Sequence, residues 1–166
     1  MALLDIIRYP DERLKQLSSP VERFDDALHV FLADLETTMR AGPGGVGIAA
    51  PQVGNFRRIA LVDVSSKAKI EHNGFLVLIN PEIISHKGFV KGREGCMSVP
   101  DYTGNVMRAE QITVEFVDAH GKSQTINSSG FEARAIQHEL DHLDGLLFLD
   151  RLVSRRSDLF RRKTYK

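Results

Sequence analysis

The sequence predicts an α+β fold, with antiparallel β-strands packed around a central helix and a further helix towards each end of the chain. Three observations predict this class. Apolar residues recur at three- and four-residue steps in residues 25–41 and again in 129–144, as on one face of a helix. Short β-rich runs separated by Gly, Asn and Pro fill the stretch from residue 58 to about 128. No repeat or linker interrupts the 166 residues, so a single domain spanning 1–166 is expected.

The first elements follow from their end signals. After a short helical turn at residues 11–17, Asp25 is a suitable N-cap for a helix that should end at the glycine-rich run 42–45. Strands are then expected at residues 58–64, 75–80 and 112–117, followed by a hairpin turn at 118–121.

The second half of the chain predicts two helices. Ser129 and Glu132 have the spacing of a capping box that starts the central helix, and Gly145 is placed to end it. An amphipathic stretch at 152–162 predicts a C-terminal helix.

Charge is balanced overall but not along the chain. The 22 Lys and Arg residues equal the 22 Asp and Glu residues, so nothing global favours DNA or a membrane as a partner. The end of the chain is nevertheless basic, with Asp158 as its one acid beside Arg151, Arg155, Arg156, Arg161, Arg162, Lys163 and Lys166.

The cellular compartment is predicted from what the sequence lacks. Acidic residues at the start do not fit a signal peptide, and no apolar run approaches the roughly 20 residues that span a bilayer. Cys96 is the only cysteine, so no intramolecular disulfide can form. We therefore expect a cytoplasmic protein.

The strongest local signal is the segment His138-Glu139-Leu140-Asp141-His142 on the central helix. Positions four apart lie on one helical face, so both imidazoles can bind one metal ion while Glu139 projects towards a bound water. The alternative is two ordinary histidines. The helix has two stripes that predict burial. One is apolar and consists of Ile136, Leu140, Leu143 and Leu147, and the other contains Phe131, Ala135, His138 and His142. Histidines on a buried face need partners for their ring nitrogens.

A catalytic metal needs a third protein ligand. No Glu follows Glu139, which argues against a thermolysin-like site, and Phe148 occupies the position of a third metzincin histidine. The ligand should lie upstream, and Cys96 is the best candidate, although a lone cysteine is more often a small buried apolar residue.

A third segment, Gly45 to Gln52, consists of small and apolar residues ending in an amide. A glycine-rich turn before a buried strand explains it equally well, and it matches neither a phosphate loop nor a dinucleotide fingerprint. In the functional interpretation, the small residues let the backbone approach an extended peptide and pair with it, and Gln52 donates a hydrogen bond to a developing oxyanion.

Together the three segments resemble the signature motifs of peptide deformylases: Gly-φ-Gly-φ-Ala-Ala-Pro-Gln at 45–52, Glu-Gly-Cys-φ-Ser at 94–98 and Gln-His-Glu-φ-Asp-His at 137–142, where φ is apolar. The resemblance implies a hydrolase that removes the formyl group from the N-terminal methionine of new polypeptides. It also implies one divalent metal ion, which is Fe²⁺ in the cell, with Zn²⁺, Ni²⁺ or Co²⁺ as alternatives. The implied ligands are Cys96, His138 and His142, and the two histidines lie on the central, metal-binding helix.

The same resemblance assigns catalytic roles. Glu139 takes a proton from water activated by the metal and returns it to the leaving amine, and the Gln52 amide and the Met97 backbone N–H hold the oxyanion. The substrate-binding residues it implies are Val46, Gly47, Gly95, Phe131 and Ala135. Glu94 and Arg108 are expected as structural supports, and family members often differ near Thr103 and Glu132.

Two other functions remain as alternatives: a different Cys-His-His metalloamidase or protease, and a non-catalytic metal- or peptide-binding module. The presence of Glu139 and Gln52 argues against the module, because ligand binding alone does not need them. The expected partners are formyl-methionyl nascent peptides, and the basic C-terminal helix is a hypothetical contact with the ribosome.

Overall fold

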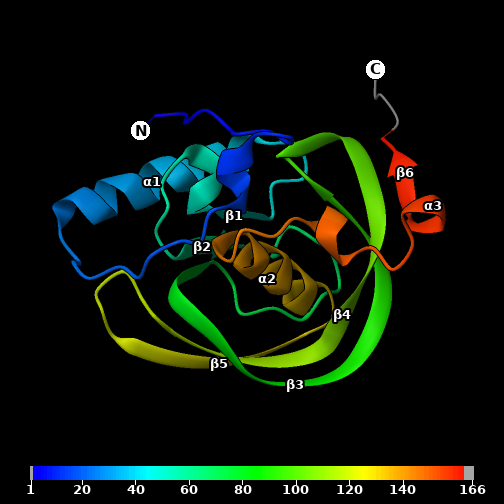
Figure 1. Ribbon diagram of the computed structural model, residues 1–166. Helices are drawn as coiled ribbons and strands as arrows, with labels where there is room; N and C mark the ends of the chain where they lie inside the picture. The colour runs from blue at the N-terminus through cyan, green and yellow to red at the C-terminus, as the bar shows by residue number, and fades with distance from the viewer. Residues whose placement is uncertain (1, 163–166) are drawn as a thin grey trace.

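The computed structural model describes residues 2–162 and confirms the α+β class. Its elements, in chain order, are η1 (Glu12–Lys15), α1 (Asp26–Ala41), β1 (Gly47–Ala49), η2 (Ala50–Val53), β2 (Ile59–Val62), β3 (Leu76–Cys96), β4 (Val99–Val117), β5 (Ser123–Ser129), α2 (Gly130–Leu143), η3 (Phe148–Arg151), α3 (Arg155–Asp158) and β6 (Leu159–Arg161). The strands form one antiparallel sheet in the order β1-β2-β3-β4-β5, with β6 added to β4. The sheet curves around α2, which lies inside the bend of β3, β4 and β5 (Figure 1).

Helix α1 has the limits that its sequence predicts. The Asp25 carboxylate accepts a hydrogen bond from the Leu28 N–H at 3.0 Å, and Gly42 is the C-cap. Its apolar face buries Leu28, Leu35 and Met39 completely. At 16 residues it is the longest helix described, and no helix among residues 2–162 is long and apolar enough to cross a membrane.

The main difference from the predicted strands is the length of the β3–β4 hairpin. Strands were expected only at 75–80 and 112–117, whereas β3 has 21 residues and β4 has 19. Most of the added part of β3 is solvent-exposed on both faces and mixes polar residues with exposed apolar ones, so no apolar alternation marks it as strand. Register shifts near both ends of β3 bend the hairpin, as bulges do. The tip is a tight turn, because Cys96 pairs with Val99.

Helix α2 is the central helix, and it ends where predicted. Ten of its 14 residues are buried, and Gly145 has a φ of 76°, a left-handed conformation suited to glycine after a helix. The predicted capping box is wrong. The Ser129 side chain makes no capping hydrogen bond. The Glu132 carboxylate accepts from the Ser128 hydroxyl at 2.8 Å and from the N–H of Asn73, 59 positions away, at 2.6 Å. A neighbouring serine and a distant residue thus take the place of the predicted capping bonds.

The C-terminal segment also differs from its prediction. The expected helix at 152–162 is reduced to the single turn α3, after which β6 pairs with β4. Leu159 and Phe160 favour this outcome, because pairing opposite Gly104 and Thr103 partly buries both side chains. Lys163 and Lys166 of the basic end lie outside the described residues.

Candidate metal centre and substrate cleft

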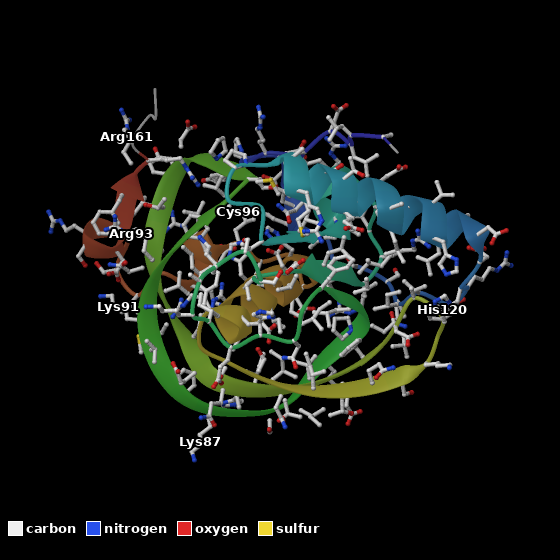
Figure 2. The ribbon with its side chains drawn as sticks, turned by 180° about the vertical axis from the view of Figure 1, so that it is seen from behind. Lys87, Lys91, Arg93, Cys96, His120 and Arg161 are labelled. Carbon is white, nitrogen blue, oxygen red and sulfur yellow. The ribbon has the colours of Figure 1, made fainter. Side chains whose placement is uncertain are left out.

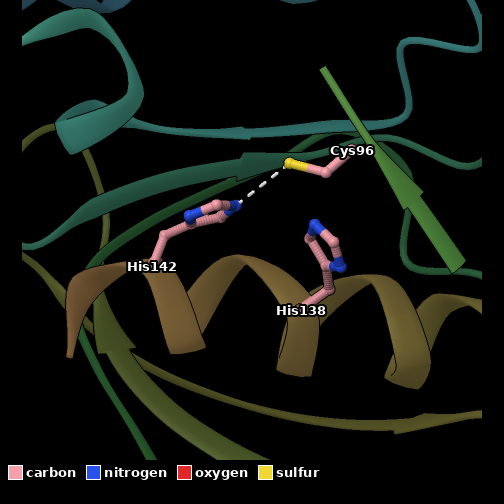
Figure 3. Close-up of side chains that lie close together, drawn as sticks. All are labelled: Cys96, His138 and His142. Atoms are coloured by element: carbon pink, nitrogen blue, oxygen red, sulfur yellow. Dashed lines mark hydrogen bonds between the residues drawn. The ribbon is translucent and has the colours of Figure 1, made fainter. Parts of the chain in front are cut away.

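The three predicted metal ligands come together at the junction of the β3–β4 hairpin and α2. The ligand atoms of Cys96, His138 and His142 all lie within 4.8 Å of one another. Cys96 is the last residue of β3, and its sulfur lies 3.4 Å from Nε2 of His142. Figure 3 shows both imidazoles rising from consecutive turns of α2 towards this sulfur. The hairpin tip and the helix therefore place residues separated by up to 46 positions around one point.

The donor set and its electrostatics fit a metal cation. One sulfur and two imidazole nitrogens are ligands that borderline divalent metals accept. Although burial opposes the charged imidazole, the Cys96 sulfur and the Glu139 and Glu94 carboxylates raise the pKa of His138 well above its usual range, so the site favours positive charge. Burial lowers the pKa of His142 well below its usual range and keeps that ring neutral, as a ligand requires.

Glu94 orients the first of these ligands. Its Oε1 lies 2.8 Å from Nδ1 of His138, which leaves the other ring nitrogen facing Cys96 and His142. The same carboxylate accepts two hydrogen bonds of 2.9 Å from Arg108 and one of 2.7 Å from Arg134. Against the opposing effect of burial, Arg108 and His138 hold the pKa of Glu94 well below its usual range. The expected role of Glu94 and Arg108 as structural supports agrees with these contacts.

Glu139 is buried but faces the cleft. One of its carboxylate oxygens, Oε1, has no hydrogen-bond partner within the described chain. Burial raises the pKa of Glu139 to about 7, against the opposing charges of His138 and Arg108. The carboxylate packs on Gly47, where an added Cβ atom would lie 2.5 Å from Oε2. Only glycine at position 47 therefore leaves room for Glu139 in this place.

The Gln52 amide has a fixed orientation beside the sulfur. Its Oε1 accepts from the Ala49 N–H at 2.9 Å, and its Nε2 donates to Ser98 Oγ at 3.0 Å and lies 3.5 Å from the Cys96 sulfur. The side chain is 1% exposed. Met97 follows Cys96 in the hairpin turn, so its backbone N–H is carried by the same rigid segment.

A cleft of about 630 Å³ opens beside this site. It is lined by all the substrate-binding residues predicted from the sequence, which are Val46, Gly47, Gly95, Phe131 and Ala135. It is also lined by residues that the sequence did not indicate, from both ends of the chain and from β3: Leu3, Leu4, Ile6, Arg8, Arg93 and Arg162. Nothing in the local pattern of these residues marks them, because they reach the cleft only through tertiary structure.

Comparison with known proteins identifies the family. Residues 3–158 match the family model described as polypeptide deformylase. The chain belongs to the peptide deformylase family. The peptide deformylase of Syntrophobacter fumaroxidans is 43% identical over 100% of this chain and 96% of its own length.

Solved structures give the same result. A crystal structure of a peptide deformylase from Legionella pneumophila has a TM-score of 0.84 at 41% identity and covers 91% of this chain and 86% of its own. The class I type b peptide deformylase of Acinetobacter baumannii with Met-Ala-Ser bound also has a TM-score of 0.84, at 34% identity, and covers 91% of this chain and 99% of its own. The predicted hydrolase acting on N-formyl peptides is confirmed, and the alternative of a non-catalytic binding module is not supported.

Proposed function

We propose that this peptide deformylase hydrolyses the formyl amide at the junction of the hairpin tip and α2, with a distinct role for each predicted residue. Cys96, His138 and His142 hold one divalent metal ion, Glu139 carries the proton, and Gln52 and the Met97 N–H bind the oxyanion. The observation that carries the proposal is the convergence of a sulfur and two ring nitrogens within 4.8 Å at the end of a peptide-sized cleft.

The metal site is assigned from its donors and from the support behind them. When bound there, a divalent ion supplies a Lewis acid that lowers the pKa of a water molecule and polarises the formyl carbonyl. The Glu94 carboxylate fixes the His138 ring, and Nε2 of His142 lies 3.4 Å from the Cys96 sulfur. We assign Fe²⁺ as the ion in the cell, with Zn²⁺, Ni²⁺ and Co²⁺ as ions that the same donors accept.

Glu139 is assigned as the proton carrier because of its position and its environment. Its carboxylate takes a proton from the attacking water as the new C–O bond forms at the formyl carbon. It then delivers that proton to the amide nitrogen as the C–N bond breaks, so that formate and a free N-terminal methionine are the products. A carboxyl group whose pKa lies near 7 exchanges protons readily in both directions at neutral pH.

Oxyanion binding falls to two donors near the sulfur. Gln52 Nε2 donates to Ser98 Oγ at 3.0 Å and lies 3.5 Å from the Cys96 sulfur. The longer contact with the sulfur is the weaker of the two, so a substrate oxygen would replace that contact. The Met97 N–H belongs to the turn that follows the ligand. Both donors are fixed before substrate binds, which is the condition for electrostatic stabilisation of the transition state.

The substrate backbone has a suitable strand to pair with. β1 lies at the end of the sheet and pairs only with β2 among the described strands, so its other edge is available to an extended peptide. Val46 and Gly47 stand on this edge, and Gly95 lies across the cleft. The methionine side chain is assigned to the apolar part of the cleft beside Phe131 and Ala135. The Met-Ala-Ser bound to the Acinetobacter relative is a peptide of the class expected here.

The decisive test combines metal analysis with a formate assay. The protein is purified without oxygen, its metal content is measured, and formate release from a formyl-methionyl peptide is followed. One metal ion per chain and turnover are expected, and both should be lost together when Cys96 is replaced by Ser or Ala. An active metal-free enzyme, or equal cleavage of internal peptide bonds, contradicts the assignment.

The identity of the metal has its own test. If iron is native, the iron enzyme prepared without oxygen should be more active than the zinc form and should lose activity in air, as the iron or the Cys96 thiolate is oxidised. Nickel or cobalt in its place should protect the enzyme. An iron form that survives air unchanged, or that is no better than the zinc form, removes the iron assignment.

We further propose that the enzyme meets nascent chains at the ribosome through its basic C-terminal segment. Of the arginines there, Arg151 is paired with Asp141, whereas Arg155, Arg156 and Arg161 are exposed. Figure 2 shows Arg161 on the same side of the molecule as Lys91 and Arg93. Exposed arginines in one region favour binding to RNA phosphates.

Variants that remove charge from the C-terminal segment test this contact better than a truncated chain does, because ending the chain after residue 151 would also remove β6. Replacing Arg155, Arg156 and Arg161 together by Gln should weaken salt-dependent co-sedimentation with ribosomes and reduce its salt slope. Cleavage of short formyl peptides should continue. Equal sedimentation of both proteins, or none at low salt, contradicts ribosome docking through this segment.

A further inference from the structure

Two arginines from distant parts of the chain reach the same end of the substrate cleft. Arg93 is carried by β3, and Arg162 follows β6 directly; both line the cleft together with Gly95. Figure 2 shows that β6 lies against the outer part of the β3–β4 hairpin, on the side where Arg93 is labelled. The C-terminal segment thus forms a wall of the cleft.

Both side chains have defined supports. The Arg162 N–H donates to the Asp101 carbonyl at 2.8 Å, which extends the pairing of β6 with β4 up to this residue. The Arg162 guanidinium lies against Gly95, where an added Cβ atom would be 2.7 Å from Nη2. The guanidinium of Arg93 lies 3.7 Å from the centre of the Phe160 ring. A residue of β6 therefore positions the arginine of β3.

These two positive charges have no carboxylate partner among residues 2–162. Neither forms an ion pair there, and Nε of Arg162 is buried without any hydrogen-bond partner in that range. The acids nearest to them in the sequence are already bonded: Glu94 to Arg108, Arg134 and His138, and Asp158 to Lys91. A buried guanidinium nitrogen without a partner is costly, and an anion arriving in the cleft satisfies it.

We propose that Arg162, with Arg93, binds an acidic side chain at one of the first positions after the formyl-methionine, so that the enzyme prefers formyl peptides with Asp or Glu there. The proposal rests on the proposed function, which places the peptide backbone along Gly95. Its ligand chemistry is a carboxylate. In a nascent polypeptide this carboxylate comes from a side chain, because the C-terminus is far from the cleft. A short test peptide also has a C-terminal carboxylate.

The first measurement compares amidated formyl peptides, in which no C-terminal carboxylate is present. These are formyl-Met-Ala-Ser-amide, formyl-Met-Asp-Ser-amide, formyl-Met-Ala-Asp-amide and the two corresponding Lys peptides. At least one Asp peptide should exceed the Ala-Ser peptide by about three- to tenfold in kcat/KM, as expected for a partly exposed charged pair. The Lys peptides should be poorer, and the difference should shrink with added salt. The free acid formyl-Met-Ala-Ser then measures the effect of a terminal carboxylate separately.

Variants assign the preference to its residue. Arg162→Met should remove most of the ratio between Asp and Ala peptides, mainly through KM, while Arg162→Lys should keep part of it. Arg161→Met is the matched control, because it removes the same charge one residue earlier from an exposed position that does not line the cleft. It should retain the wild-type ratio.

Binding of the deformylated tripeptides provides a readout without turnover. Calorimetry should show tighter binding of Met-Asp-Ser-amide or Met-Ala-Asp-amide than of Met-Ala-Ser-amide, and the difference should vanish in Arg162→Met. Equal kcat/KM and equal affinity across the charge series overturn this inference while leaving deformylation intact. A failure of formate release from every peptide overturns the proposed function instead, and the binding series then still decides the charge preference. A ratio unchanged by Arg162→Met also overturns the assignment.

Discussion

Two groups of buried polar side chains meet at α2, and they differ in how completely they are bonded. In the first group, Glu94 of β3 and Asp141 of α2 have hydrogen-bond partners on each carboxylate oxygen, and Arg108 donates to both carboxylates. In the second, Oε1 of Glu139 has no partner in the described chain, and the ligand atoms of Cys96, His138 and His142 lie within 4.8 Å of one another beside the cleft. A buried polar atom without a partner costs free energy, so the first group is built for stability and positioning. The second group is left open for chemistry.

The largest expected effect comes from removing the centre of the bonded group. Arg108→Met would leave the buried carboxylates of Glu94 and Asp141 short of their shared donor. Breaking one partner out of a buried ion network costs about 3–5 kcal/mol, so the free energy of unfolding should fall by that amount in urea titrations. A loss below about 1 kcal/mol contradicts the structural role of this network.

The next largest effect concerns the open group and should appear in turnover alone. Glu139→Gln keeps the size of the side chain but cannot carry the proton, so kcat should fall by roughly 10²-fold or more. Metal content and the urea midpoint should stay near the wild-type values. If the variant is fully metal-loaded and still turns over at the wild-type rate, Glu139 is not the proton carrier.

A smaller loss of activity is expected where Glu139 is held in place by packing. In Gly47→Ala, the new methyl group would lie 2.5 Å from the wild-type position of the Glu139 carboxylate and must displace it. A shift of this size in a reacting group lowers kcat by about ten- to a hundredfold. Metal analysis provides the control, because the three ligands are not touched. An Ala variant with normal kcat would show that the carboxylate has room to move.

The smallest effect is expected at the exposed end of the bonded group. Arg151 binds the same Asp141 carboxylate as Arg108 does, but its side chain is 47% exposed, compared with 4% for Arg108. Arg151→Met should therefore cost less than about 1 kcal/mol, as surface ion pairs do. Urea unfolding of the two variants compares a buried arginine that bonds both Glu94 and Asp141 with a half-exposed one that bonds Asp141 alone. Equal losses of unfolding free energy would contradict this ranking.

The sequence predicts the open group far better than the bonded one. His138, Glu139 and His142 lie within five consecutive positions of one helix, so local periodicity is enough to place them together. Cys96 also joined them as predicted. The partners of Asp141 and Glu94 include residues up to 44 positions away, and no local pattern pairs them.

The same limit explains the errors in the fold. Helix α1 and the end of α2 follow from local signals, and both were predicted. Glu132 was assigned to a capping box, but Asn73 from a distant loop binds it instead. The middle of β3 has no apolar alternation because it is exposed, and β6 forms only because β4 is there to pair with it. Tertiary pairing decides these elements.

The N-terminal segment has a consequence for how firmly the site is held. The Ile7 N–H donates to the Gln52 carbonyl at 2.7 Å, and the Tyr9 N–H donates to the Ser98 carbonyl at 2.7 Å. These two bonds tie Gln52, the proposed oxyanion donor, and its partner Ser98 to a segment without regular secondary structure. Such segments open more often than a sheet or helix does, and amide hydrogen exchange reports that opening. Transient detachment of residues 7–9 would therefore loosen the Gln52 amide while leaving Cys96, His138 and His142 on their hairpin and helix, so the two parts of the site are expected to differ in local stability.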